Sequence, residues 1–246
     1  MTTFIHIMIL AFTTLLLNCN GKTENHRLNT SKQDTIIVNE KSKVLDNPKG
    51  LIKNYNGENN KLFVFVGQKL SVDPLPHKEG LMDGGFKAEY LILQKVYGNF
   101  LNDTIEFVAY DHYGIPPFSK FENVLLFVSA DSGLYYHQKY MYNDVYQTKG
   151  GKWAGTYAEY DYGHAYNKHT KVKPIKIDFI KEISYPTKIV RSDSQIVTIA
   201  YPKPYFKTVG DKAIAIYGNY VDELFVLKLD GYLTARGIFE PKHKKD

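Results

Sequence analysis

The stretch Leu62-Phe-Val-Phe-Val-Gly67 opens the region that decides the fold, which runs from Lys61 to Ser129. Phe63 and Phe65 lie on one side of an extended chain and alternate with apolar residues on the other. The residues that share this other side are Leu62, Val64, Val66, Leu70 and Val72. The pattern predicts a strand that is buried on both faces at its start and on one face at its end. Gly67 lies where a strand glycine usually marks a bulge.

Four further strands are predicted downstream. Residues 86–97 and 103–110 alternate, and we expect the inward side chains to be Phe86, Ala88, Tyr90, Ile92, Ile105, Phe107 and Ala109. The continuous apolar run at residues 124–128 is short enough to be a central strand, and we expect Val64 and Leu125 to lie in the core. Residues 134–146 form the fifth strand, with Tyr136, Tyr140 and Tyr142 on one face and Tyr135, His137, Lys139 and Met141 on the other. Strands at this spacing, with no helical period between them, predict an all-β, closed or nearly closed antiparallel barrel.

Four motifs in this order resemble the strands of netrin-like modules, the OB-type barrels of tissue inhibitors of metalloproteinases and their bacterial relatives. They are Leu62-Phe-Val-Phe-Val-Gly67, Phe86-Lys-Ala-Glu-Tyr90, Lys95-Val-Tyr-Gly98 and Val124-Leu-Leu-Phe-Val128. The resemblance implies an OB-like five-stranded barrel over residues 61–185. The inhibitors act through a free N-terminal cysteine, and the modules are usually stapled by cysteines. Here the single cysteine, Cys19, precedes a long polar segment, so the resemblance implies the fold and not the inhibitory mechanism.

The N-terminus has the pattern of an exported lipoprotein. Residues 1–18 carry no Lys, Arg, Asp or Glu, and residues 4–17 form an apolar run of the length of a signal-peptide core. The run ends at Leu15-Leu-Leu-Asn-Cys19, which resembles a bacterial lipobox. We therefore expect residues 1–18 to be a signal peptide and Cys19 to carry the lipid that holds the protein at a membrane of the bacterial cell envelope. The alternative is an incidental cysteine.

Composition restricts the partners. Residues 19–60 are polar and rich in Asn, Lys, Thr and Ser, which predicts a largely disordered tether. The formal net charge is +5, and this excess is spread along the chain apart from the closing residues 242–245. Nucleic-acid binding would call for a clustered basic stripe, so we expect no nucleic-acid partner. With one cysteine the chain can form no internal disulfide, and an exported domain must then rely on its core.

The C-terminal part, residues 186–246, is predicted to be a small β subdomain or an extension of the sheet. A boundary is indicated by Pro186 and the polar residues 191–195. Short strands are expected at residues 196–200, 213–217, 223–229 and 232–239. Asp230-Gly231 between the last two is a typical two-residue hairpin signal.

No catalytic motif is present. His112, His137, His164 and His169 fall in no compact metal-ligand spacing, no nucleophile elbow surrounds a serine, and the paired glycines open no phosphate-binding helix. We therefore predict no metal and no cofactor. The sequence does not decide whether two carboxylates are paired for glycoside cleavage, because the pairing depends on their distance in the folded protein.

One segment is dense in aromatic residues and poor in Val, Ile and Leu, and is predicted to be a long loop. Its candidate ligand-binding residues are Trp153, Tyr157, Tyr160, Tyr162 and Tyr166. Such rings can stack on sugars or bases, or can pack as a lid over the end of the barrel. Three functions follow as hypotheses: a non-enzymatic envelope lipoprotein that binds a protein or a glycan, an envelope glycan hydrolase, and a structural component of an envelope assembly. Two facing carboxylates would favour the hydrolase.

Overall fold

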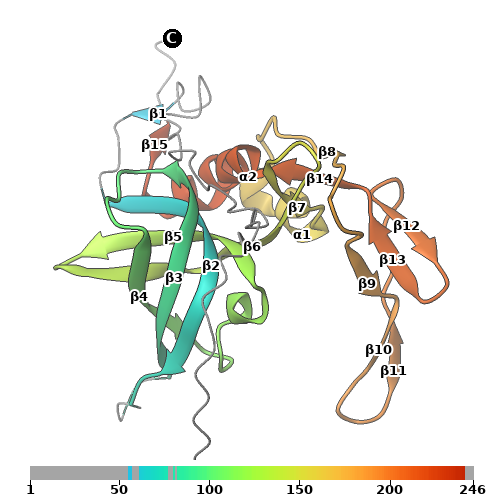
Figure 1. Cartoon of the computed structure of the whole chain (residues 1–246), viewed down its shortest axis with the longest axis horizontal. Coiled ribbons are helices and arrows are strands. Elements are labelled where there is room, and N and C mark those ends of the chain that lie inside the picture. Colours follow the sequence, from blue (N-terminus) through green and yellow to red (C-terminus); the bar gives the residue numbers. More distant parts are fainter. Residues whose placement is uncertain (1–54, 57–60, 77–79, 81, 242–246) are drawn as a thin grey trace, which may run out of the picture. The chain divides into compact units, whose positions relative to one another are not determined.

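The structure, a computed structural model, describes residues 55–56, 61–76, 80 and 82–241, all within the unit Glu40–Asp246 (Figure 1). The predicted signal peptide, Cys19 and the tether to residue 54 lie outside the described residues. In this part of the chain the fold is mainly β, and its centre is a ring of five hydrogen-bonded strands.

The five predicted strands of this ring are confirmed. They are β2 (Leu62–Pro74), β3 (Gly84–Tyr97), β4 (Thr104–Asp111), β5 (Asn123–Asp131) and β6 (Leu134–Gln147). Neighbours pair antiparallel in the order β4-β3-β2-β5-β6. A parallel bridge between Val108 and Tyr136 joins β4 to β6 and closes the ring. A short 3-10 helix, η2 (Pro117–Lys120), precedes β5.

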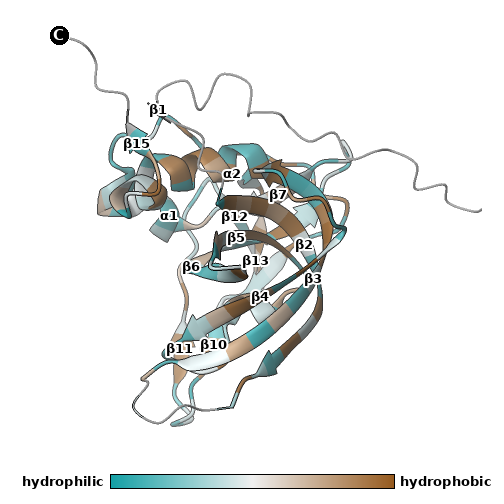
Figure 2. Ribbon diagram, turned by 90° about the vertical axis from the view of Figure 1, so that its left-hand side faces the viewer, coloured by the Kyte–Doolittle hydropathy of each residue, from teal (hydrophilic) through white to brown (hydrophobic). Residues whose placement is uncertain are grey.

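Strand β5 explains why its sequence is apolar without alternation. Val124, Leu126 and Val128 face the interior of the ring, where they pack with Phe65, the inward residues of β3 and β4, and Phe118. Leu125 and Phe127 face the opposite way and pack against a helix on the outside of the sheet. Both faces of the strand are therefore buried, and Figure 2 shows the resulting hydrophobic colour along β5.

The predicted inward faces of β3 and β4 are confirmed, and the predicted sharing of faces along β2 and β6 holds only in part. Leu70, predicted on the same face as Val64, is 51% exposed, because the register with β3 shifts between Val66 and Gly67 and again beyond Lys69. The bulge predicted at Gly67 is one of these shifts. In β6, Tyr140 has a φ of 65°, a left-handed conformation that breaks strict alternation.

Three more strands continue the sheet beyond β6, in the order β7-β14-β8. They are β7 (Trp153–Thr156), β14 (Tyr217–Tyr220) and β8 (Ile175–Lys176). The predicted loop is therefore wrong at residues 153–156, where the glycine serves packing. A Cβ on Gly155 would lie 3.0 Å from Leu224 Cδ1 and 3.1 Å from the carbonyl oxygen of Asp144, so glycine lets a helix lie close to this strand.

Small sheets occupy the C-terminal part, as predicted. One contains β9 (Ser184–Pro186), β12 (Phe206–Val209) and β13 (Lys212–Ala215); another is the hairpin of β10 (Lys188–Val190) and β11 (Ile196–Thr198); a third pairs β1 (Tyr55–Asn56) with β15 (Glu240–Pro241). A third apolar cluster, centred on Phe179 and Phe206, packs between β7 and these sheets.

The two strands predicted at residues 223–229 and 232–239 are wrong. Residues Val221–Lys228 form helix α2, and Leu229–Leu233 continue it as one turn of π-helix, η4. Asp230-Gly231 therefore lies inside a helix and makes no hairpin. The helical signals were present: two acidic residues in the first turn, Lys228 in the last, and Glu223 Oε2 accepting a hydrogen bond from the Tyr220 backbone N–H at 3.1 Å.

Helix α2 looked like a strand because its apolar residues surround it on nearly every side. Leu224, Phe225, Val226 and Leu227 are all buried, so the sequence shows no amphipathic period. The helix covers the outer face of the ring, where Phe225 stacks on Tyr97 with ring centroids 5.1 Å apart (Figure 1). A helix of five residues, α1 (Glu159–Gly163), and a 3-10 turn, η3 (Ala165–Asn167), replace the rest of the predicted loop.

Candidate functional site

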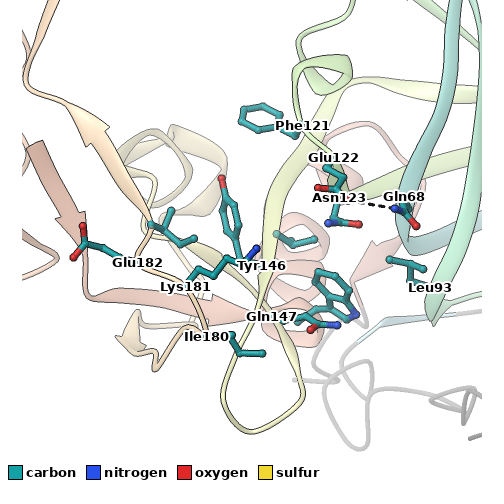
Figure 3. Close-up of a pocket in the computed structure, with 13 residues that line it drawn as sticks. Gln68, Leu93, Phe121, Glu122, Asn123, Tyr146, Gln147, Ile180, Lys181 and Glu182 are labelled. Carbon is teal, nitrogen blue, oxygen red and sulfur yellow. Dashed lines mark hydrogen bonds between the residues drawn. The ribbon is translucent and has the colours of Figure 1, made fainter. Parts of the chain in front are cut away.

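A pocket of about 740 Å³ lies where β6 and β7 meet the segment that leads into β9 (Figure 3). We call it the Trp153 pocket. It is lined by Gln68, Leu93, Phe121, Glu122, Asn123, Val145, Tyr146, Gln147, Trp153, Ile180, Lys181, Glu182 and Ile183. Its size is typical of small-molecule sites, and its mixture of aromatic walls and a few polar groups is typical of them too.

Backbone hydrogen bonds hold the two sides of the pocket together. Gln147 faces Trp153 across the β6–β7 ladder. The Ile180 N–H donates to the carbonyl oxygen of Gln147 at 3.0 Å, and the Lys149 N–H donates to that of Asp178 at 2.8 Å. The segment at residues 180–183 is therefore fixed to the end of β6, so this wall of the pocket is built into the fold.

Aromatic side chains form two of the walls. Trp153 is the single tryptophan of the sequence and is half-buried against the apolar layer under α2. Tyr146 also lines the pocket, and its hydroxyl donates to Asp144 Oδ2 at 2.8 Å. Tyr185 donates to the same oxygen at 3.1 Å. Burial, and then the charge of Asp144, raise the pKa of the Tyr146 hydroxyl, so this ring stays neutral and fixed in place.

The polar lining is rich in amides. Gln68, Asn123 and Gln147 each offer both a donor and an acceptor. Gln68 Nε2 donates to Glu122 Oε1 at 3.3 Å. Lys181 is the one basic residue in the lining, against Glu122 and Glu182. The lining therefore carries more negative than positive charge, which disfavours phosphate and nucleic-acid ligands and suits a neutral or cationic one.

The two glutamates do not face one another. Both are exposed, and in Figure 3 the carboxylate of Glu182 points away from Glu122 and from the other labelled residues. Paired carboxylates that cleave a glycosidic bond must flank a common point. Glu122 and Glu182 are therefore not arranged as such a pair.

The five aromatic residues predicted as a ligand site are divided among three places. Trp153 alone lines the pocket. Tyr157 stacks between Tyr205, at 3.7 Å between ring centroids, and Tyr162, at 5.1 Å. The Tyr162 hydroxyl donates to Asn219 Oδ1, and burial raises its pKa. These two tyrosines therefore pack against other parts of the fold.

The other two tyrosines lie in an exposed aromatic group. Tyr160 is 69% and Tyr166 is 51% exposed. Both contact the ring of His164, which also packs against Tyr232 at 4.7 Å between centroids. Tyr232 donates a hydrogen bond to the Tyr160 hydroxyl at 3.0 Å. This group is on the surface and does not line the Trp153 pocket.

His112, His137 and His164 have different surroundings. His112 Nδ1 lies 3.4 Å from Asp83 Oδ1 in a smaller hollow of about 580 Å³, where Lys139 also pairs with Asp83 at 2.6 Å. His137 is half-buried in the ring against Phe118, and desolvation lowers its pKa to about 4. Within the described residues, no group of three or more His, Cys, Asp or Glu side chains is arranged to hold a metal ion.

Sequence reasoning missed most of the pocket lining and one buried ion pair. Asn123 and Gln147 stand at strand ends and Gln68 follows the bulge at Gly67, all positions where polar residues are ordinary, so no local signal marks them. The ion pair joins Lys228 of α2 to Asp161 of α1. It was hidden because the two helices that carry it were interpreted as a strand and a loop.

No protein-family model, curated protein or solved structure matches this chain. Among the described helices, none has the length and apolar character needed to cross a lipid bilayer.

Proposed function

We propose that this protein is a non-enzymatic binding protein of the bacterial cell envelope, held at a membrane by a lipid on Cys19, that binds a glycan in the Trp153 pocket. One observation carries the binding role: the pocket of about 740 Å³ combines aromatic walls with three side-chain amides and has no facing pair of carboxylates. An aromatic face and bifunctional amides suit a sugar, which offers an apolar ring face and hydroxyls that both donate and accept.

The ring of five strands supports the finer interpretation of the fold. Its order, β4-β3-β2-β5-β6 with a closing β4–β6 bridge, agrees with an OB-like barrel of the netrin-like kind. The short η2 between β4 and β5 lies between the third and fourth strands of the ring. On this proposal the ring is the scaffold and the sheet extension through β7 supplies the binding wall.

The single tryptophan provides a direct test. Emission of the full-length protein, excited where tryptophan absorbs and tyrosine does not, reports on Trp153 alone, because the sequence has a single tryptophan. We expect neutral oligosaccharides, such as chitohexaose, cellohexaose and maltohexaose, to be tested beside anionic heparin, and at least one neutral glycan to change the emission saturably. Gln147→Ala should weaken that response, and Tyr160→Ser should leave it unchanged. If no glycan changes the emission, the glycan proposal is wrong.

A glycan hydrolase is the second candidate, because Glu122 and Glu182 both line the pocket. Incubation of the wild-type protein with any oligosaccharide that it binds decides between the two. Binding without release of reducing ends supports the binding protein. Release that Glu122→Gln abolishes, with binding retained, would establish the hydrolase.

The membrane anchor has its own test. Wild-type cells grown with radiolabelled palmitate should yield labelled protein in the membrane fraction, and Cys19→Ala should give neither the label nor membrane retention. Labelled Cys19→Ala protein would show that the N-terminal segment has been misinterpreted.

A further inference from the structure

One carboxylate bridges an amine and an amide inside the protein. Asp161 of α1 accepts from Lys228 Nζ through Oδ1 at 2.5 Å and from Asn143 Nδ2 through Oδ2 at 3.0 Å. The Lys228 and Asp161 side chains are 5% and 8% exposed, and Asn143 is 8% exposed. The three residues come from α2, α1 and β6, so the tertiary structure alone brings them together.

The cluster is incompletely satisfied as it stands. The Asn143 Oδ1 atom is buried without a hydrogen-bond partner, and the same holds for Oδ1 of Asn167, which donates its Nδ2 to the Asp161 backbone carbonyl. Lys228 Nζ also lies over the Tyr232 ring, 5.4 Å from its centroid. A buried ammonium and an unpartnered amide oxygen are both costly, and such groups in a native structure call for an explanation.

We propose that Lys228 and Asn143 react to form an intramolecular amide cross-link, with Asp161 transferring the protons. The two reacting groups bind two oxygens of one carboxylate, which holds them together in a site closed to water. Asn143 Oδ1 has no hydrogen-bond partner, whereas Nδ2 is bonded to Asp161, so the leaving nitrogen already lies beside the carboxylate that would protonate it. A lysine amine is an effective nucleophile once an adjacent base removes its proton.

The step balances without any co-reactant. Asp161 Oδ1 takes a proton from the Lys228 ammonium, and the freed Nζ lone pair attacks Asn143 Cγ. The Cγ–Nδ2 bond then breaks as Asp161, through Oδ2, returns the proton to the leaving nitrogen, and the same carboxylate passes a second proton from Nζ to the departing ammonia. One of the three ammonium protons stays in the new amide N–H. The other two depart with Nδ2 as ammonium, and Asp161 ends as the carboxylate that it was.

Only Asn143 fits the role of acceptor. Asn167 donates its Nδ2 to the backbone carbonyl of Asp161 and not to the carboxylate, so no proton path connects its amide to Lys228. The reaction would replace a buried charge by a neutral amide. It would also tie α2 to β6 covalently in a chain whose single cysteine can form no internal disulfide. Such a link constrains the unfolded chain in the way that a disulfide does.

Mass spectrometry of the purified full-length protein tests the proposal. A tryptic digest should contain a branched peptide that joins the Asn143 and Lys228 segments and is lighter than their sum by one ammonia, about 17 Da. Lys228→Arg and Asn143→Ala should both lack it. The matched control Lys152→Arg changes an exposed lysine and should retain the branched peptide.

Three outcomes would overturn the proposal. Unmodified Asn143 and Lys228 peptides in the wild-type digest would show a plain ion pair, and this measurement needs no variant to fold. A loss of about 18 Da, one water, would place the link between Lys228 and Asp161 instead. A branched peptide that persists in Asn143→Ala would move the acceptor elsewhere.

Discussion

The interior of the ring and the layer beneath α2 are two cores built on opposite faces of the same strands. The ring interior is filled by residues that alternate along β3, β4 and β5, and its buried polar groups are few. The layer beneath α2 combines equally buried apolar residues with a polar cluster at its edge, around Asp161 and Lys228. Local alternation builds the first core. The second exists only once a distant helix has docked, and the buried ion pair of Lys228 with Asp161 lies at its edge.

The largest expected effect on stability comes from removing one partner of the buried ion pair between Lys228 and Asp161. We expect Asp161→Ala to destabilise the fold by about 3 to 5 kcal/mol, because it leaves Lys228 buried without its partner. Glu159→Ala, which removes an exposed carboxylate from the same helix, is the control and should have little effect. Urea unfolding measures both. Equal stability of the two variants would mean that the ion pair contributes nothing.

Adjacent residues of β5 allow the two cores to be weakened separately. Leu126→Ala opens the ring interior, and Leu125→Ala opens the layer beneath α2; both side chains are fully buried. Each should cost about 2 to 5 kcal/mol. Hydrogen exchange should then separate them, since Leu125→Ala should expose the α2 amides while the ring stays protected. Uniform loss of protection in both variants would show that the two cores unfold together.

Lowering the pH should destabilise the ring interior through His137. Burial lowers its pKa to about 4 in the folded protein, below the usual unfolded value of about 6.5. Between these pH values His137 is protonated in the unfolded chain and neutral in the folded ring. The free energy of unfolding therefore falls as the pH decreases from about 6.5 to 4, by about 3 kcal/mol in all. Urea unfolding at several pH values should show a weaker dependence for His137→Phe than for the wild type. The same pH dependence of stability in His137→Phe and in the wild type would contradict the lowered pKa of His137.

The smallest effects should come from the aromatic residues. Tyr160→Ser changes an exposed ring and should alter stability by no more than about 0.5 kcal/mol. Tyr157→Ser removes a ring stacked between Tyr205 and Tyr162 and should cost about 1 to 3 kcal/mol. Thermal melts of the two variants make the comparison. If Tyr160→Ser melts as early as Tyr157→Ser, the exposed group is part of the fold.

The sequence predicted the ring well because each of its strands has a recognisable pattern in consecutive residues. Ile105, Phe107 and Ala109 alternate with polar neighbours, and the run at residues 124–128 is too short for a helix. The same reasoning failed at α2, where apolar residues on every side imitate a buried strand and Asp230-Gly231 imitates a hairpin. It failed again at Trp153, since an aromatic segment with glycines can be a strand when those glycines admit a neighbouring helix.

The sequence by itself determined the five strands, the bulge at Gly67 and the absence of internal disulfides, because these depend on neighbouring residues and on counting. Only the tertiary structure decided which face of β2 meets α2, that Trp153 lines a pocket while Tyr157 packs, and that Asn143, Asp161 and Lys228 share one buried site. The physical reason is that side-chain alternation is a property of a few consecutive residues. A pocket or a buried polar cluster is made from elements far apart in the chain, and its members carry no common local pattern.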